Sequence, residues 1–312
     1  MKLSYDVVVI GAGHAGCEAA SAAARLGSRT LLITIDMEKI ASMSCNPAVG
    51  GVAKGQIVRE IDALGGMMGR VTDLSSIQFR MLNRSKGAAM WSPRAQCDKH
   101  RFSREWRHIL ENTKNLYLWQ DSVVDILFDL SGEKPCVRGV KTCMGVEIEC
   151  SRVVLTAGTF LEGVMHCGEA SAEGGRAGDQ AAHGITASLT RLGFESGRMK
   201  TGTPVRLDAR TINFDALEVQ EGDMEPSKFS CDADTEEVSN QLPCFMVYTS
   251  KRVHDILRTG FDRSPLFNGT ISGIGPRYCP SIEDKLRTFA DKEQHQLFLE
   301  PEGRNTNEYY LN

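Results

Sequence analysis

Residues 5–26 read YDVVVIGAGHAGCEAASAAARL. The apolar run at the start of this stretch predicts a buried strand, and the alanine-rich run at its end predicts a helix. The glycines between them have the spacing GxGxxG, which gains meaning from a strand before it and a helix after it. Gly11 permits a tight turn, Gly13 lets backbone approach a pyrophosphate, and Gly16 lets the helix pack closely on the strand. We therefore predict that this turn binds a dinucleotide.

The dinucleotide is expected to contact the whole turn, because the first N–H groups of the helix face its phosphates. The residues that we assign to this contact are Gly11, Ala12, Gly13, His14, Ala15 and Gly16. A second strand is predicted over 29–35, and Asp36 follows it. An acidic residue about 20 positions past the third glycine holds the ribose hydroxyls in such folds. Asp36 is also typical of a solvated turn, and the spacing does not distinguish FAD from NAD.

The composition is that of an ordinary globular protein, with 312 residues of which 41% are hydrophobic and 24% charged. This length is typical of about two domains. The chain enters a predicted strand directly, without a charged and then apolar leader, and no apolar run approaches the ~20 residues that a membrane span needs. We therefore expect a cytoplasmic protein that does not contact a membrane.

Several kinds of chemistry are disfavoured by the motifs. Ten cysteines are scattered without CxxC or Cys/His ligand spacing, so neither a zinc site nor a disulfide framework is expected. The histidines form no HExxH pattern, and no metal site is predicted. His14 is expected to pack or to face the backbone and not to act as a base. Neither a GxSxG elbow nor a Walker A sequence occurs, which separates the chain from serine hydrolases and P-loop enzymes.

The net charge of −4 argues against a wholly basic surface, but cations are concentrated between residues 80 and 107. Only Asp98 and Glu105 oppose them there. The cations are Arg80, Arg84, Lys86, Arg94, Lys99, Arg101, Arg104 and Arg107. This group predicts a patch that meets phosphates. The alternative is the solvated face of a helix predicted over 100–112.

The rest of the first half predicts alternating helices and strands. A polar, glycine-rich loop is predicted over 42–55, followed by a helix over 56–64 with Ile57, Ile61 and Leu64 on one side. Strands are predicted over 115–118, 122–128, 137–144, 147–150 and 152–156. The last strand ends in Ala157-Gly158, which resembles the second signature of two-dinucleotide flavoproteins. In those proteins the backbone near Val123 passes the adenine; the alternative for Val123 is plain sheet core.

The second half suggests an insertion. A second glycine cluster, GGRAGD over 174–179, precedes a helix predicted over 181–192, and acidic residues dominate 206–240. We predict an α/β protein: a Rossmann-like FAD-binding domain of the two-dinucleotide type with a smaller inserted α/β domain. The predicted bounds are 1–205 for the first part, 206–274 for an inserted NADH-handling subdomain, and 275–312 for the return. Because such a domain needs a later return strand, we expect a longer chain.

Two of the cysteines lie in glycine- and proline-rich loops, Cys45 in SCNPAVGG and Cys279 in GPRYCP. A neighbouring cation such as Lys54 or Arg277 favours the thiolate. The thiolate then acts as a nucleophile or a proton carrier. The alternative is a small buried side chain. Cys45 has no CxxxxC partner, so a dithiol redox cycle is not expected.

Together these motifs resemble the GidA (MnmG) family of tRNA uridine 5-carboxymethylaminomethyl modification enzymes. The resemblance runs from Asp6 to Glu308, with the acidic region poorly matched. The motifs that carry it are GAGHAGCEAA, MSCNPAVGGVAKGQIVREIDALGG, IQFRMLNRSKG, PRAQCDK, VVLTAGTFL, GGRAGD, KTGTPVRLDARTI, GIGPRYCPSIEDK and FLEPEG. SCNPAVGG and GPRYCPSIEDK are close to diagnostic.

The resemblance implies an enzyme with FAD, NADH and a methylene-tetrahydrofolate carbon, which modifies C5 of the wobble uridine in certain tRNAs. It also implies a GTPase partner, MnmE, and a homodimer; the family's C-terminal helical region is absent here. By position, Gly11 to Gly16 bind FAD, with Val123 and Ala182 beside the flavin. The segment associated with nicotinamide is Gly275, Pro276, Arg277, Tyr278, Cys279, Pro280, Ser281, Ile282, Glu283, Asp284, Lys285, Leu286, Arg287, Thr288 and Phe289.

Cys45 and Cys279 match the family's paired functional cysteines. Our hypothesis is that one thiol activates C6 of uracil or acts as an acid or base, and that the two converge beside the flavin; which thiol does which stays open. Lys285 and Arg277 are candidate tRNA contacts. The alternatives are a folate- and FAD-dependent tRNA uridine methyltransferase, a flavin oxidoreductase acting on a small molecule, and a flavin-bearing scaffold.

Overall fold

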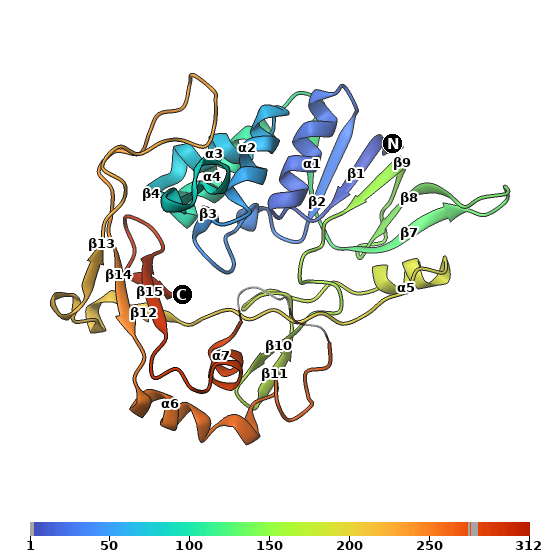
Figure 1. Ribbon diagram of the computed structural model, residues 1–312. Helices are drawn as coiled ribbons and strands as arrows, with labels where there is room; N and C mark the ends of the chain where they lie inside the picture. Colours follow the sequence, from blue (N-terminus) through green and yellow to red (C-terminus); the bar gives the residue numbers. More distant parts are fainter. Residues whose placement is uncertain (1–2, 274, 276–279) are drawn as a thin grey trace.

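A six-stranded sheet organises the first half of the chain in the computed structural model, which describes residues 3–273, 275 and 280–312 (Figure 1). Its strand order is β6-β2-β1-β9-β8-β7. The strands are β1 (Ser4–Ile10), β2 (Thr30–Thr34), β6 (Leu116–Gln120), β7 (Val123–Asp129), β8 (Cys136–Thr142) and β9 (Glu147–Leu155). β6, β2, β1 and β9 are parallel, so their carboxyl ends meet at one edge. The predicted α/β class is confirmed.

Two helices cover one face of this sheet, α1 (His14–Arg25) and α4 (Lys99–Glu111) (Figure 1). α4 begins where the Asp98 side chain accepts hydrogen bonds from two backbone N–H groups of the first turn. Its residues Phe102, Trp106 and Leu110 recur at helical spacing and are fully buried against the strands. This layer positions the start of α1 at the carboxyl edge.

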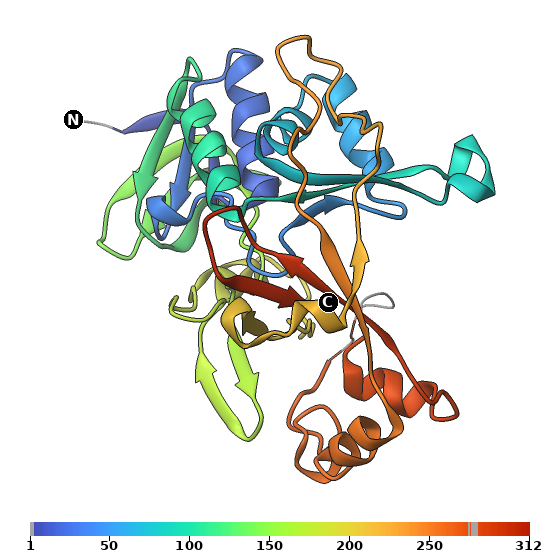
Figure 2. The ribbon, with the colours of Figure 1, turned by 90° about the vertical axis from the view of Figure 1, so that its left-hand side faces the viewer.

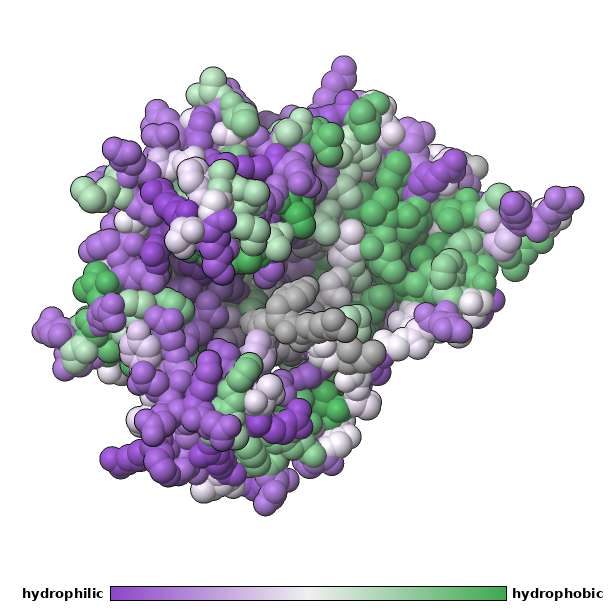
Figure 3. Space-filling model, in the orientation of Figure 1, coloured by the Kyte–Doolittle hydropathy of each residue, from purple (hydrophilic) through white to green (hydrophobic). Residues whose placement is uncertain are grey.

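The β-meander β7-β8-β9 continues the same sheet beyond β1, and β7 and β8 pack with α5 (Ile185–Arg191) over the other face of β1 and β2. Figure 3 shows apolar side chains gathered over this side of the molecule. The strands predicted separately over 147–150 and 152–156 are one strand, β9. Its first half pairs with β8 while nearly its whole length pairs with β1, so the polar pair Ser151-Arg152 marks the end of the β8 pairing and not a break.

A three-stranded sheet, β3 (Ala48–Gly50), β5 (Ser92–Cys97) and β4 (Ser76–Leu82), follows with α2 (Gly55–Ala63) and α3 (Met68–Ser75). The loop predicted over 42–55 therefore contains a strand, because β3 obtains its hydrogen bonds from the distant β5. The helix predicted over 56–64 is present as α2, but its apolar side faces solvent, because Ile57 is 53% and Leu64 89% exposed. Gly55 and Val58 face the sheet instead, since only glycine fits against Pro93 there.

The second half of the chain forms a five-stranded antiparallel sheet, in the order β12-β16-β15-β14-β13. Its strands are β12 (Arg206–Asp208), β13 (Glu218–Gln220), β14 (Cys244–Tyr248), β15 (Gln296–Pro301) and β16 (Glu308–Leu311). They come from both sides of the predicted boundary at 274/275, and that boundary stays a prediction. The acidic stretch also contacts the first half: Asp73 accepts from the N–H groups of Phe229 and Ser230.

The remaining elements lie outside the three larger sheets, and the β10-β11 hairpin projects from the body of the protein in Figure 2. They are β10 (Val164–Cys167), β11 (Ala170–Glu173), α6 (Lys251–Arg258), α7 (Ile282–Thr288) and the 3-10 turns η1 (Met37–Lys39), η2 (Arg84–Lys86), η3 (Ala88–Met90), η4 (Ala209–Thr211), η5 (Phe214–Ala216) and η6 (Phe261–Arg263). The helix predicted over 181–192 begins only at Ile185, after Gly184 with φ +98°. Among the described residues no helix has the length and apolarity needed to span a membrane.

Candidate functional site

The glycine turn lies at the carboxyl ends of β1 and β9, where two glycines permit contacts between backbone segments. Gly11 has φ +95°, and a Cβ on it would lie 2.6 Å from the carbonyl oxygen of Thr156. A Cβ on Gly16 would lie 1.8 Å from the carbonyl oxygen of Gly11. Both separations are far below van der Waals contact, so the packing functions expected of these two glycines are confirmed.

Gly13 differs from its neighbours, because a Cβ built there meets no described atom within 4 Å. It is the N-terminal residue that flanks α1, and no side-chain hydrogen bond caps this helix within the described part of the chain. No described residue therefore fills the space beside Gly13 at the start of α1. An uncapped helix start beside a glycine is the arrangement that accepts a pyrophosphate. These residues fit the diphosphate of FAD.

His14 packs at the edge of this turn. Its Nε2 lies 3.2 Å from the carbonyl oxygen of Ala41, and its ring centroid lies 5.2 Å from that of Phe102. Burial lowers the pKa of His14, against the hydrogen bond with Ala41, which raises it. The imidazole is therefore neutral near pH 7, and the expectation that it packs is confirmed.

Asp36 and the second glycine cluster meet beside the end of β2. Asp36 accepts from the N–H of Glu38 at 2.9 Å, and its other oxygen lies 3.6 Å from Lys39 Nζ. Lys39 also pairs with Asp179, and Arg176 Nε donates to Asp179 at 2.5 Å. Although burial opposes it, these two cations hold the pKa of Asp179 below its ordinary value. The sequence did not predict this contact.

The segments of Val123 and Ala182 also meet. Val123 is buried and is the first residue of β7. Just before it in the chain, the N–H of Asp121 donates to Thr34 O at the carboxyl end of β2. A Cβ on Gly184 would lie 2.2 Å from the carbonyl oxygen of Val124, so the chain after Ala182 contacts the start of β7. Ala182 itself donates to Phe160 O at 2.8 Å. The roles of both residues beside a flavin stay predictions.

Ala157 and Gly158 continue directly from β9 at the same edge. Ala157 O accepts from the N–H of Phe160 at 3.1 Å, which forms a turn. Gly158 has φ +57°, and a Cβ there meets no described atom within 4 Å. The predicted turn after the strand is therefore present, and its contact with a cofactor stays a prediction.

The loop of Cys45 is tied to the glycine turn, because Ala41 N–H donates to Ala12 O at 2.8 Å. The Cys45 sulfur is half-buried and lies 3.2 Å from the phenol oxygen of Tyr310. Arg206 donates to the carbonyl oxygens of Ser44 and Cys45, at 3.1 and 2.6 Å. The sequence missed both Tyr310 and Arg206 as neighbours of this cysteine, and only the motifs KTGTPVRLDARTI and FLEPEG pointed to their vicinity.

Cys279 and residues 276–278 lie outside the described residues, so the convergence of the two thiols stays a prediction. The described flanks of the nicotinamide segment are well anchored. A Cβ on Gly275 would lie 2.6 Å from the Cε of Lys200, whose Nζ pairs with Asp284 at 3.2 Å. Ser281 caps α7 by accepting from the N–H of Asp284 at 3.2 Å, and Leu286 is buried. Ser281, Asp284 and Leu286 thus have structural contacts; a cofactor contact by the segment stays a prediction.

The cations predicted to form one phosphate-binding patch are largely paired with carboxylates, which corrects that prediction for five of the eight. All of these acids except Glu105 lie outside residues 80–107, so the local count of charges missed them. The pairs are Arg84 with Asp223, Arg94 with Glu300, Lys99 with Glu302 and Glu308, Arg101 with Glu105, and Arg107 with Glu38 and Glu111.

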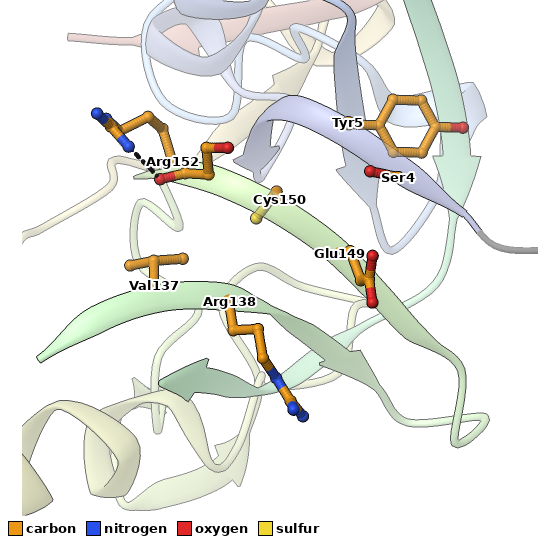
Figure 4. A pocket seen from close by; sticks show the side chains of 8 residues that line it. Ser4, Tyr5, Val137, Arg138, Glu149, Cys150 and Arg152 are labelled. Carbon is orange, nitrogen blue, oxygen red and sulfur yellow. Dashed lines mark hydrogen bonds between the residues drawn. The ribbon is translucent and has the colours of Figure 1, made fainter. Parts of the chain in front are cut away.

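An open hollow of 390 Å³ lies at the other end of β1, where β8 and β9 part (Figure 4). Its lining residues are Ser4, Tyr5, Val137, Arg138, Glu149, Cys150, Ser151 and Arg152. Burial raises the pKa of the Cys150 thiol to about 11, so this sulfur stays protonated near neutral pH. Ligands of such sheets bind at the carboxyl ends of the strands. We therefore place the candidate site at the glycine turn and not in this hollow.

Known proteins resemble this chain over its whole length. Residues 6–312 match the family described as glucose inhibited division protein A. The chain belongs to this family. It is 62% identical over all 312 residues to the tRNA uridine 5-carboxymethylaminomethyl modification enzyme MnmG of Porphyromonas gingivalis, and 61% identical to that of Bacteroides thetaiotaomicron. It covers 49% of each, so the chain spans about half the length of these relatives.

Solved structures confirm the fold. Two crystal forms of GidA from Aquifex aeolicus superpose with TM-scores of 0.91 and 0.92, at 47% and 50% identity. Each comparison covers 99% of this chain and 49% or 52% of the GidA chain. The predicted Rossmann-type α/β fold and the predicted family are therefore both confirmed.

Proposed function

We propose that the protein acts in the modification of wobble uridine in certain tRNAs, where it adds a carboxymethylaminomethyl group at C5. Its MnmG relatives bear the name of this modification. The observation that carries the proposal is the open, uncapped start of α1 at Gly13, joined to the Cys45 loop through Ala41 and Ala12. A cofactor bound there would lie beside the loop that carries the Cys45 thiol.

FAD is the dinucleotide that we assign to this turn. The first N–H groups of α1 next to Gly13 would hold its diphosphate, and Asp36 would hold its ribose hydroxyls. The Asp36 carboxylate has further acceptor lone pairs for the ribose hydroxyls, because its partners among the described residues are the N–H of Glu38 and the Nζ of Lys39. When bound, FAD supplies the electron and one-carbon transfer chemistry, with electrons from NADH and the carbon from methylene-tetrahydrofolate.

Cys45 is the candidate nucleophile or proton carrier among the described residues. As a nucleophile, its thiolate forms a C–S bond at C6 of uracil, and the electron pair of the C5–C6 double bond moves to C5. C5 then attacks the methylene carbon of an iminium ion that the one-carbon unit of the folate forms with the amine of glycine, and the electron pair of the C=N double bond moves to the nitrogen. Loss of the C5 proton and cleavage of the C–S bond restore the double bond and the thiolate. The second thiol, Cys279, is the partner that accepts or returns the proton.

The remaining partners follow from the same assignment. We propose the segment 275–289 as the contact for NADH, and Lys285 and Arg277 as contacts for tRNA phosphates. A GTPase of the MnmE type completes the reaction, and the protein acts as a homodimer in the cytoplasm. A flipped or unpaired wobble base can reach a thiol in a loop at the carboxyl edge.

Replacing each cysteine in turn tests the proposal. Cys45→Ser and Cys279→Ser are assayed for modified uridine in tRNA by mass spectrometry, with NADH, the folate and the GTPase present. FAD occupancy, read from visible absorbance, shows whether each variant keeps its cofactor. Loss of product with FAD retained supports the proposal, and Cys231→Ser is the matched control on an exposed thiol. Full activity in both variants rejects it, and a 5-methyluridine product favours the methyltransferase alternative.

A further inference from the structure

Tyr310 contacts the Cys45 sulfur from the far end of the chain. The two residues are 265 positions apart, yet the phenol oxygen and the sulfur are 3.2 Å apart. Tyr310 is 1% exposed, so the protein and not bulk solvent surrounds its hydroxyl. A buried tyrosine hydroxyl usually has a defined hydrogen-bond partner. The sulfur of Cys45 is one such partner here.

The phenol ring is fixed from the neighbouring strand. Arg206 lies directly opposite Tyr310 in the β12–β16 pair, and its guanidinium carbon lies 4.8 Å from the ring centroid. The same guanidinium donates to Ser44 O and Cys45 O. Its Nε donates at 2.7 Å to Glu302, which is 0% exposed. One cross-strand pair therefore holds both the backbone and the thiol of Cys45.

We propose that Tyr310 is the positioning residue for the Cys45 thiol: its phenol O–H donates to the sulfur and favours the ionised form at a fixed orientation. This inference rests on the proposed function, in which Cys45 acts as a nucleophile or proton carrier. A hydrogen bond to the charged form of a group stabilises that form. A fixed direction of the sulfur also aligns it with the atom that it attacks. Tyr310 acts through Cys45 and does not itself react.

The test follows the alkylation of Cys45 by iodoacetamide, resolved from the other cysteines by peptide mass mapping. Rates are measured over a range of about pH 6 to 10, since the thiolate is the reactive form. Tyr310→Phe removes only the donor oxygen. In this variant we expect the pH at which the alkylation rate is half its maximum to rise. For a rise of about one pH unit, the alkylation rate at neutral pH falls roughly tenfold. A profile that matches the unmodified protein overturns the proposal.

Tyr309→Phe is the matched control, because it removes the same atom from the adjacent residue. The Tyr309 ring packs 5.1 Å from that of Phe214, away from the Cys45 contact. Its alkylation profile equals that of the unmodified protein if the effect belongs to Tyr310. A shift of equal size in both variants means that the strand end, and not the hydroxyl, governs Cys45, and also overturns the proposal.

Folding is monitored in the same experiment, since the buried thiols of Cys97 and Cys244 become reactive if a variant unfolds. Should Tyr310→Phe unfold, 3-fluorotyrosine at position 310 keeps the ring and provides a stronger donor. Below the pH at which the fluorinated phenol itself ionises, the alkylation rate of Cys45 then rises, and an unchanged rate there overturns the proposal. Alkylation needs no tRNA or cofactor. If Tyr310→Phe shows the expected shift in the pH profile of alkylation but the unmodified protein does not modify tRNA, the result counts against the proposed function and not against this contact.

Discussion

The hydroxyl of Thr156 donates to the carbonyl oxygen of Gly11 at 2.8 Å, and so joins the end of β9 to the glycine turn. The same hydroxyl lies 2.9 Å from Ile10 O, which also accepts from the Thr156 N–H. The turn is thus held by the end of β9, the last strand of the meander, more than 100 residues away along the chain. Two sequence signatures, the glycines and the strand end, form one site.

Thr156→Val removes this hydroxyl while keeping the shape of the side chain. We expect the free energy of unfolding to fall by about 1–2 kcal/mol, because the carbonyl oxygen of Gly11 loses its hydroxyl donor while that of Ile10 keeps the Thr156 N–H. FAD affinity falls as well, since the turn loses its support. Urea unfolding and FAD titration measure both. Thr190→Val is the control, because its hydroxyl bonds within the exposed α5 to Thr186 O; an equal loss in that variant would contradict the prediction.

Gly16→Ala and Gly13→Ala are expected to separate folding from binding. An added Cβ at Gly16 collides with the backbone, so we expect the free energy of unfolding to fall by about 3 kcal/mol or more. An added Cβ at Gly13 enters open space, so the fold persists while FAD binding weakens. Thermal unfolding by circular dichroism and the FAD absorbance spectrum report the two effects. Normal FAD binding by Gly13→Ala would reject the assignment of the diphosphate to this turn.

The glycine turn could be predicted because its signal is local: strand, turn and helix are adjacent in sequence, and the spacing follows from backbone sterics. α4 was also predictable, since Phe102, Trp106 and Leu110 repeat at helical spacing. α2 was not. Ile57 and Leu64 share a side of that helix, but the packing of Gly55 on Pro93 turns this side to solvent.

The surroundings of Cys45 depend on register between distant strands. Tyr310 and Arg206 reach the cysteine because β12 and β16 pair with these two residues opposite each other. No periodicity within either strand fixes that register or the position of the sheet. The pairing of basic residues with distant acids has the same origin: Glu300 and Glu302 enter from β15 and its end, and the composition of 80–107 alone suggested unpaired charge.

Lys99→Met is expected to destabilise the junction between the two halves of the chain. Lys99 pairs with Glu302, which is fully buried and otherwise held by Arg206. Removing one partner of a buried carboxylate costs about 3–5 kcal/mol. Arg101→Met is the matched control on the same helix, because its pair with Glu105 is exposed and contributes about 0.5 kcal/mol or less. Equal losses in urea unfolding would show that Glu302 does not depend on Lys99.

Two of the buried thiols, Cys97 and Cys244, are expected to make the fold less stable at alkaline pH. Burial raises the pKa of Cys97 and that of Cys244 to about 12, from an ordinary value of 9.0. Above the ordinary value the unfolded chain loses these protons and the folded chain keeps them. The unfolded state then binds fewer protons, so the free energy of unfolding falls as pH rises from about 9 toward about 12, at up to about 1.4 kcal/mol per pH unit for each thiol.

Urea unfolding at several alkaline pH values measures this slope. Cys97→Ala removes one of the two groups, so its free energy of unfolding declines less steeply with pH than that of the unmodified protein, even if its stability at neutral pH is lower. Cys231→Ala removes an exposed thiol and leaves the slope unchanged. If Cys97→Ala and Cys231→Ala decline in parallel, the Cys97 thiol ionises equally in both states and its burial does not govern the alkaline response.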